Sequence, residues 1–216
     1  MQTSSMWCLL RSATRVCRRG VGVAACVLAC AAPSASAGSE WQLQKDKNGV
    51  AIFTRDVEGS PFLAVKATAA FRQPVEKLAE YLGDGSECMQ WRKMCKSSRV
   101  LQVNSEDERL VYQVLDLPWP IADRDMVIQS VTEIDPASRS VTVRIETQSD
   151  AYPLQKYTRA ETSSQIQLRA IDAENAEFTY IIHVDLGGDV SPALVNSQLV
   201  SSTLEDVERL LAMAGQ

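Results

Sequence analysis

The single histidine of the chain, His183, stands two residues before Asp185 in the stretch YIIHVDL. Side chains alternate along a β-strand, so both residues lie on the same face if this stretch is extended. They can then form an acid–base pair, half of a metal site, a polar contact to a ligand, or a purely structural pair. Because no GxSxG, HExxH, Walker or GxGxxG motif accompanies them, we expect no enzyme, no metal site and no cofactor.

A second group of polar residues lies in DLPWPIADRDMV, residues 116–127. Its two prolines fix φ and lack a backbone donor, which is typical of a sheet edge or corner, and the tryptophan between them adds a large apolar side chain. Arg124 has a planar fork that binds a carboxylate or several carbonyls. It can lock the corner together with Asp123 or Asp125, or it can contact a ligand headgroup.

Four further polar side chains stand on stretches that are typical of strands. Arg144 and Glu146 share one face and form either a solvated ion pair or a polar anchor inside a cavity. Tyr112 and Tyr180 are half-buried strand residues, or phenols that orient a ligand's hydroxyl or carbonyl group in an apolar tunnel. The candidate ligand-binding residues are therefore Tyr112, Arg124, Arg144, Glu146, Tyr180 and His183.

These side chains must be positioned by an α+β domain of consecutive antiparallel strands and two helices. Helical spacing in residues 73–85 predicts a short helix that Gly83 can cap, and a long C-terminal helix is expected from Pro192, after the N-cap Ser191. A turn or short helix is expected around Trp41. Strands are predicted at residues 49–55, 62–71, 98–105, 108–117, 124–135, 140–148, 163–171 and 177–186.

Residues 1–37 have the parts of a secretory signal peptide. They contain four arginines and no acidic residue, then an apolar run from Val21 to Ala32 and an Ala-x-Ala end. The run is shorter than the roughly 20 residues of a membrane span. We predict cleavage after Ala37 and a periplasmic or secreted protein. The alternatives are a lipoprotein acylated at Cys26 or Cys30, and a mitochondrial transit peptide.

The part that remains, residues 38–216, is acidic. Removing the four arginines of the leader from the chain leaves 18 basic and 27 acidic residues, a net charge of −9. An acidic domain is a poor candidate for nucleic acid and for a purely electrostatic hold on anionic lipid headgroups. We expect a monomer with no nucleic-acid partner.

Two cysteines, Cys88 and Cys95, remain in residues 38–216. Residues seven apart in one unbroken helix lie about 10 Å apart, beyond the ~7 Å limit on the Cα separation of a disulfide. A disulfide between them therefore requires a bend, and the alternative is two buried or free thiols. No CxxC motif or neighbouring histidine completes a metal site.

Four motifs in this order resemble the START (steroidogenic acute regulatory related lipid transfer) domain family over about residues 40–213. They are the Trp, Asp and Gly-Val of WQLQKDKNGVAIFTR, the segment around Trp91, PWPIADRD, and YIIHVDLGGDVSPALVN. The resemblance implies a helix-grip fold, in which a curved antiparallel sheet wraps around the C-terminal helix and encloses an apolar tunnel. Residues 127–130 lack the cavity arginine of animal sterol carriers, which argues against a sterol held in their manner.

The resemblance implies a protein that encloses one lipid or other hydrophobic molecule and carries it between membranes, with transient membrane contact. Two alternatives remain. One is an enzyme of the polyketide cyclase type that uses His183 as its base, and the other is a ligand sensor that binds a protein partner.

The link to the C-terminal helix is the expected gate. Gly187-Gly188 is the only pair of adjacent glycines in the chain, and glycine tolerates the φ/ψ changes of a hinge. Pro192 and Asn196 belong to the first, more polar half of the helix, which we expect to loosen near a membrane. Alanine at both glycines should then slow lipid transfer without lowering the melting temperature by more than a few degrees. The alternative is an ordinary tight turn.

Overall fold

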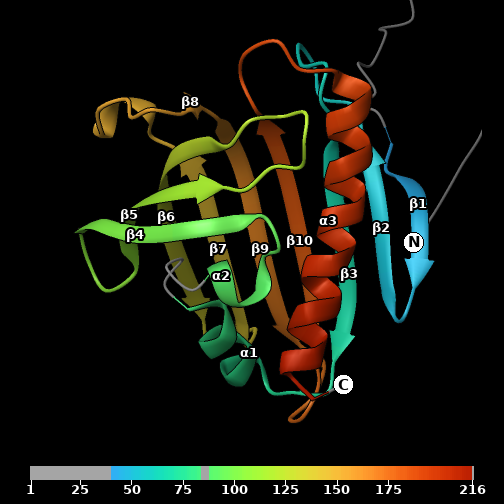
Figure 1. Ribbon diagram of the computed structural model, residues 1–216. Helices are drawn as coiled ribbons and strands as arrows, with labels where there is room; N and C mark the ends of the chain where they lie inside the picture. The colour runs from blue at the N-terminus through green and yellow to red at the C-terminus, as the bar shows by residue number, and fades with distance from the viewer. Residues whose placement is uncertain (1–39, 84–87, 216) are drawn as a thin grey trace, which may run out of the picture. The chain divides into compact units, whose positions relative to one another are not determined.

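A strongly curved sheet of ten strands is the central element of the described chain (Figure 1). The computed structural model describes residues 40–83 and 88–215, so the predicted leader with Ala37, Cys26 and Cys30 lies outside the described residues. The strands follow the order β1-β2-β3-β10-β9-β7-β6-β5-β4 with antiparallel neighbours, and short β8 pairs in parallel with β6. Their bounds are β1 Gln42–Lys47, β2 Val50–Arg55, β3 Ala64–Phe71, β4 Cys95–Val103, β5 Glu108–Leu115, β6 Arg124–Asp135, β7 Ser140–Thr147, β8 Thr158–Arg159, β9 Glu161–Ala170 and β10 Ala176–Asp185.

The long helix α3, Pro192–Met213, lies along one face of this sheet and packs on β2 and β3 (Figure 1). The shorter helix α1, Val75–Leu82, packs on β9 and β7, and α2, Cys88–Trp91, packs on β4 and α3. A 3₁₀ turn, η1, spans Ser149–Ala151. A curved sheet that holds a C-terminal helix confirms the predicted α+β helix-grip fold.

Alternation along β10 decides which side chains reach α3. Every second residue of the strand is buried, and each residue between them is partly exposed. The buried set joins the same apolar core as Val207 and Leu210 of α3, which are fully buried. The inward residues of β10 are Ala176, Phe178, Tyr180, Ile182 and Val184.

The expectation of a turn or helix around Trp41 was wrong, because β1 follows Trp41 directly. All six residues of β1 are exposed, so no apolar alternation marks it in the sequence. The strand forms because its backbone pairs with β2 at the edge of the sheet, a tertiary contact that local pattern does not reveal. The two-residue strand β8 was likewise not predicted.

The caps of the two predicted helices follow the sequence closely. Gly83 ends α1 with φ of 58°, a left-handed conformation that favours glycine, as predicted. Ser191 precedes α3 at the N-cap position, but its side chain makes no capping hydrogen bond. The first turn of α3 is therefore started by Pro192 rather than by a serine hydroxyl.

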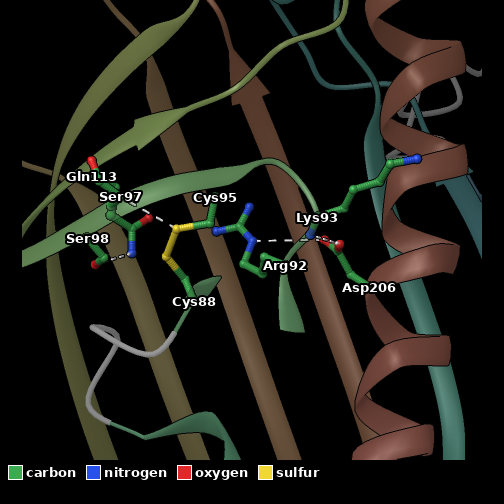
Figure 2. Close-up of a disulfide and its surroundings, with 8 residues drawn as sticks. All are labelled: Cys88, Arg92, Lys93, Cys95, Ser97, Ser98, Gln113 and Asp206. Carbon is green, nitrogen blue, oxygen red and sulfur yellow. Dashed lines mark hydrogen bonds and ion pairs between the residues drawn. A yellow bond between two sulfur atoms is a disulfide. The ribbon is translucent and has the colours of Figure 1, made fainter. Parts of the chain in front are cut away.

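The disulfide between Cys88 and Cys95 is present, with a Cα–Cα separation of 5.9 Å (Figure 2). Helix α2 ends at Trp91, the chain turns through residues 92–94, and Cys95 opens β4. This turn is the bend that a bridge between residues seven apart requires, so the prediction is confirmed.

Candidate functional site

A cavity of about 50 Å³ lies between α3 and the inner face of the sheet. Its sheet wall consists of Leu115 and of three alternate residues of β10, and its cover comes from the β5–β6 loop. Most of these side chains are apolar, which suits a hydrophobic ligand. The residues of the sheet wall and cover are Leu115, Leu117, Pro118, Ile121, Tyr180, Ile182 and Val184, and Leu186 adds to the lining from the loop after β10.

The wall that α3 contributes is more polar. Gln198, Ser202 and Asp206 line the cavity at intervals of four residues, so they lie on one side of the helix. Asp206 is buried, although it carries a carboxylate. The cavity therefore has an apolar wall on the sheet and a polar stripe on the helix.

Asp206 meets a second charged residue, Arg92, which directly follows α2. Arg92 Nε lies 4.0 Å from Asp206 Oδ2, and the backbone N–H of Lys93 donates a 2.6 Å hydrogen bond to Asp206 Oδ1 (Figure 2). Burial raises the pKa of Asp206, and the positive charge of Arg92 partly opposes that rise. Sequence reasoning missed this pair, because 114 positions separate its members and only the polar stripe of α3 hinted at it.

A second, smaller cavity of about 30 Å³ lies on the other side of Arg92. Arg92 lines both cavities, Trp91 lines the second, and Tyr180 lines the first. The Trp91 and Tyr180 rings meet edge to face with 6.0 Å between centroids. The two cavities thus share Arg92 and lie next to this aromatic contact.

The two cavities are small compared with known ligand pockets. Pockets that hold small organic ligands usually measure about 300–1,000 Å³. Cavities of about 50 and 30 Å³ are several times smaller. A lipid can therefore enter the interior only when some of the covering elements move apart.

Of the predicted ligand-binding residues, Tyr180 is the one that lines the larger cavity. Its side chain is buried, and burial raises the pKa of its phenol. The positive charge of Arg92 and the side chain of Ser164 on the neighbouring strand β9 partly oppose this rise in pKa. Tyr180 is thus a neutral hydrogen-bonding group at the wall of the cavity.

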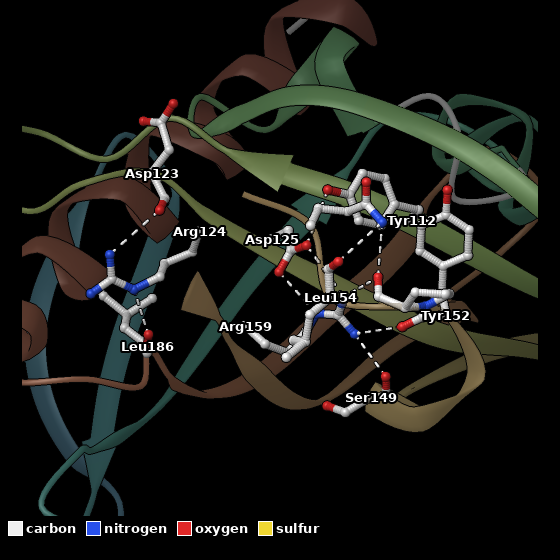
Figure 3. Close-up of polar contacts among 11 residues, drawn as sticks. Tyr112, Asp123, Arg124, Asp125, Ser149, Tyr152, Leu154, Arg159 and Leu186 are labelled. Atoms are coloured by element: carbon white, nitrogen blue, oxygen red, sulfur yellow. Dashed lines mark hydrogen bonds and ion pairs between the residues drawn. The ribbon is translucent and has the colours of Figure 1, made fainter. Parts of the chain in front are cut away.

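The structure places Tyr112 on the opposite face of the sheet. Its hydroxyl donates a 3.0 Å hydrogen bond to Asp125, and its ring packs on Tyr152 with 5.3 Å between centroids (Figure 3). Burial and the hydrogen bond to Asp125 raise the pKa of Tyr112 to about 12. The phenol stays protonated at physiological pH and joins the packing of the outer face rather than the cavity.

Three other predicted residues also point away from the cavities. His183 Nε2 lies 3.0 Å from the Ser60 hydroxyl, in the loop between β2 and β3. Arg144 forms an exposed ion pair with Glu133, and Glu146 accepts a 2.8 Å hydrogen bond from the Ser163 hydroxyl. None of His183, Arg144 and Glu146 is among the described residues that line the two cavities.

The corner around Arg124 is a structural junction (Figure 3). The Arg124 guanidinium donates hydrogen bonds to the carbonyls of Ala122, at 2.7 Å, Leu186, at 2.5 Å, and Gly187, at 3.3 Å. It also donates a weaker bond of 3.4 Å to the Asp123 carbonyl. The guanidinium thus binds carbonyls, and the pairing considered with the carboxylates of Asp123 and Asp125 is not made. Arg124 instead ties the start of β6 to the loop that leads into α3.

The carboxylate of Asp125 has a different partner, Arg159 of β8. Arg159 Nε and Nη2 lie 2.8 and 3.3 Å from the two Asp125 oxygens, and both side chains are buried. Arg159 also donates hydrogen bonds to the carbonyls of Ser149, Tyr152 and Pro153. Sequence reasoning did not single out Arg159, because nothing in its neighbourhood distinguishes it from a surface arginine.

The predicted gate residues lie in ordered contacts. Gly187 and Gly188 have φ of 61° and 69°, and the Gly187 N–H donates a 2.8 Å hydrogen bond to Asp185. Asn196 of α3 accepts a 2.9 Å hydrogen bond from the Leu63 N–H, while Pro192 is exposed at the start of the helix. Both the loop and the first half of α3 are thus anchored in this conformation.

Alanine at Gly187 should therefore destabilise the protein, contrary to the small effect expected from the sequence. A Cβ there would lie 2.8 Å from the Arg159 carbonyl oxygen, and φ is positive. We expect the free energy of unfolding to fall by about 1–3 kcal/mol, measured by urea denaturation. Gly59→Ala is the control, because it shares a positive φ but its Cβ meets no atom within 4 Å. Equal losses for the two variants would contradict the steric explanation.

The START domain family model matches residues 28–216. A STAR-related lipid transfer protein from Xanthomonas axonopodis is 28% identical, with a TM-score of 0.73 over 82% of this chain and 99% of that chain. An uncharacterized protein of Pseudomonas aeruginosa is 25% identical over 177 residues, 81% of this chain and 87% of that protein. Human StAR-related lipid transfer protein 5 is 14% identical, with a TM-score of 0.75 over 84% of this chain and 88% of that chain, and shares the fold.

Within residues 40–83 and 88–215, no helix is long and apolar enough to cross a bilayer. The same residues contain no group of three His, Cys, Asp or Glu side chains that could hold a metal ion.

Proposed function

Because the chain belongs to the START domain family, we propose that it binds one lipid or other hydrophobic molecule beside α3 and carries it between membranes. The observation that carries this proposal is the apolar-walled cavity under the β5–β6 loop. Burial of apolar surface stabilises such a complex by about 0.8 kcal/mol per CH₂ group. The same burial keeps the ligand from escaping into water, so release requires contact with a membrane.

The cover of the cavity carries a side chain suited to that contact. Pro118 and Ile121 of the β5–β6 loop line the cavity, whereas Trp119 between them is 93% exposed. Tryptophan is enriched at membrane–water interfaces, where its ring enters the headgroup region and its N–H stays hydrated. Docking through Trp119 would place a bilayer directly on the β5–β6 loop that covers the cavity. Insertion of Trp119 into the bilayer would then favour movement of this loop away from the cavity.

The position of His183 favours a carrier over the enzymatic alternative. A cyclase-type reaction in the interior needs a base that reaches the bound molecule. His183 lies on the outer side of β10 against Ser60 and is absent from both cavity linings. The polar groups that do line the larger cavity suit recognition of a ligand's polar end.

The protein acts in the periplasm or outside the cell, after cleavage behind Ala37. The Cys88–Cys95 disulfide supports this location, because structural disulfides persist mainly in oxidising compartments. The basic, acid-free stretch and apolar run of residues 1–37 support it as well.

Replacing Trp119 with serine should slow lipid transfer about tenfold, a change of ~1.4 kcal/mol in the membrane-bound step. The measurement follows a fluorescent phospholipid from donor to acceptor vesicles in the presence of the protein. Ile134→Ser is the control, because Ile134 is also an exposed apolar residue but lies at the far end of β6. Transfer that is no faster with the native protein than without it would refute the carrier function, and unchanged transfer with Trp119→Ser would refute this docking site.

A further inference from the structure

Two charged side chains, Arg92 and Asp206, lie at the inner wall of the cavities. Among the described residues that line either cavity, they are the only charged ones. The 4.0 Å between Arg92 Nε and Asp206 Oδ2 exceeds the usual 2.7–3.2 Å range of a hydrogen bond. Within residues 40–83 and 88–215, the Arg92 guanidinium makes this ion pair and a contact of 5.9 Å with the Trp91 ring, and no hydrogen bond. Toward the described residues, the guanidinium therefore leaves N–H donors unused.

The gap between the two groups is held by rigid elements. The Arg92 N–H donates a 2.7 Å hydrogen bond to the Cys88 carbonyl, and the Arg92 carbonyl accepts one of 3.2 Å from the Cys95 N–H. The disulfide closes the same segment (Figure 2). On the other side, Asp206 is part of α3 and is oriented by the Lys93 N–H. One oxygen atom placed between Nε and Oδ2 can lie within hydrogen-bond distance of both.

The charges at this gap restrict which oxygen fits. Arg92 and Asp206 neutralise each other, and residues 38–216 carry a net charge of −9. A carboxylate ligand would bring a second negative charge next to Asp206 in a water-poor cavity, where charge repulsion is strong. An ester oxygen can accept from Arg92 but offers no proton to Asp206. A hydroxyl group can do both, because it accepts from Arg92 and donates to the carboxylate.

This inference rests on the proposed function, since it concerns the ligand of the same cavity. We propose that Arg92 and Asp206 form the polar anchor of the cavity and select an uncharged lipid that carries a hydroxyl group at its polar end. The neighbouring Ser202 and Tyr180 offer further neutral hydrogen-bonding groups at the same wall. The apolar part of the ligand would extend along the β10 wall toward the β5–β6 loop.

Three ten-carbon ligands separate the possibilities: decan-1-ol, methyl decanoate and decanoate. Each competes with a fluorescent hydrophobic dye bound to the purified protein at neutral pH. We expect decan-1-ol to bind at least tenfold more tightly than either decanoate or methyl decanoate. A ratio of ten corresponds to ~1.4 kcal/mol.

Asp206→Asn tests the anchor directly, because asparagine keeps the shape and can still accept the Lys93 hydrogen bond. Without the negative charge, Arg92 faces the cavity uncompensated, so decanoate should gain at least tenfold and overtake decan-1-ol. Glu205→Gln is the matched control. It removes a negative charge from the adjacent position of α3, where Glu205 forms a surface ion pair with Lys93 and lines neither cavity. This variant should keep the preference of the native protein.

The outcomes distinguish this inference from the proposed function. If the native protein binds the three ligands with no preference for decan-1-ol, or if Asp206→Asn leaves the order unchanged, the anchor is refuted while ligand binding stands. If none of the three displaces the dye, both proposals fail. If Asp206→Asn does not fold, Arg92→Gln gives the reciprocal test: decan-1-ol should bind several-fold more weakly and decanoate should not gain. Unchanged binding of both ligands by Arg92→Gln would also refute the anchor.

Discussion

Replacement of Asp125 by asparagine is expected to lower the free energy of unfolding by about 3–5 kcal/mol, the usual cost of breaking a buried ion pair from one side. The Asp125 carboxylate has no exposed surface, and it accepts two hydrogen bonds from Arg159 and one from Tyr112 (Figure 3). Asparagine leaves the buried Arg159 guanidinium without a counter-charge. The same guanidinium holds three carbonyls of the segment that follows β7, so this segment should loosen with it.

Urea denaturation of Asp125→Asn and of Asp123→Asn provides the comparison. Asp123 is two positions away, but its carboxylate pairs with the largely exposed Lys96 at 2.7 Å. Surface pairs contribute little, so Asp123→Asn should cost less than about 1 kcal/mol. Similar losses for both variants would show that the Arg159 pair does not stabilise the corner.

Loss of the Cys88–Cys95 disulfide is expected to lower the free energy of unfolding by about 2–3 kcal/mol, as closure of a loop of this length predicts. The bridge closes the segment that carries Trp91 and Arg92, so its removal should also loosen the contact between the two cavities. The double variant Cys88→Ser, Cys95→Ser, followed by thermal or urea unfolding, measures the effect.

Mass measurement and reduction supply the controls. The native protein should be lighter by two hydrogens before reduction, and a reductant should lower its melting temperature to that of the double-serine variant. The same reductant should leave the variant unchanged. Two thiols that react with an alkylating agent in periplasmic material would contradict the bridge.

The structure does not favour opening at the Gly187-Gly188 hinge. Arg124 holds the carbonyls of Leu186 and Gly187, and Asn196 holds the backbone at Leu63, so both ends of the link to α3 are anchored. The cover formed by the β5–β6 loop carries the exposed Trp119 instead. Opening at a membrane therefore begins, in our proposal, at this cover, while Arg124 keeps the start of α3 in place.

Much of the fold follows from local pattern. Runs rich in β-branched and apolar residues, bounded by turn residues, predicted the long strands, and period-2 alternation was clear in residues 140–148. Pro192 predicted where α3 begins, and the glycine after Leu82 predicted where α1 ends. These features can be recognised in the sequence because each depends only on residues close in the chain. Side chains alternate along a strand, the proline ring fixes φ at the start of a helix, and glycine adopts the positive φ at its end. Helix geometry likewise predicted that a bridge between Cys88 and Cys95 needs a bend, but whether the two cysteines are bridged stayed open in the sequence.

The composition of the site depended on tertiary structure. Tyr180 and His183 are three residues apart on β10, so alternation puts them on opposite faces, but only the packing of α3 decided that the tyrosine faces the cavity. Arg92 and Asp206 meet because α2 and α3 pack together. Local sequence pattern does not predict which charged residues, distant in the chain, become neighbours in the fold. Burial then gives such a pair its importance, because a charge that is ordinary in water becomes a strong and selective group once the fold has removed the water around it.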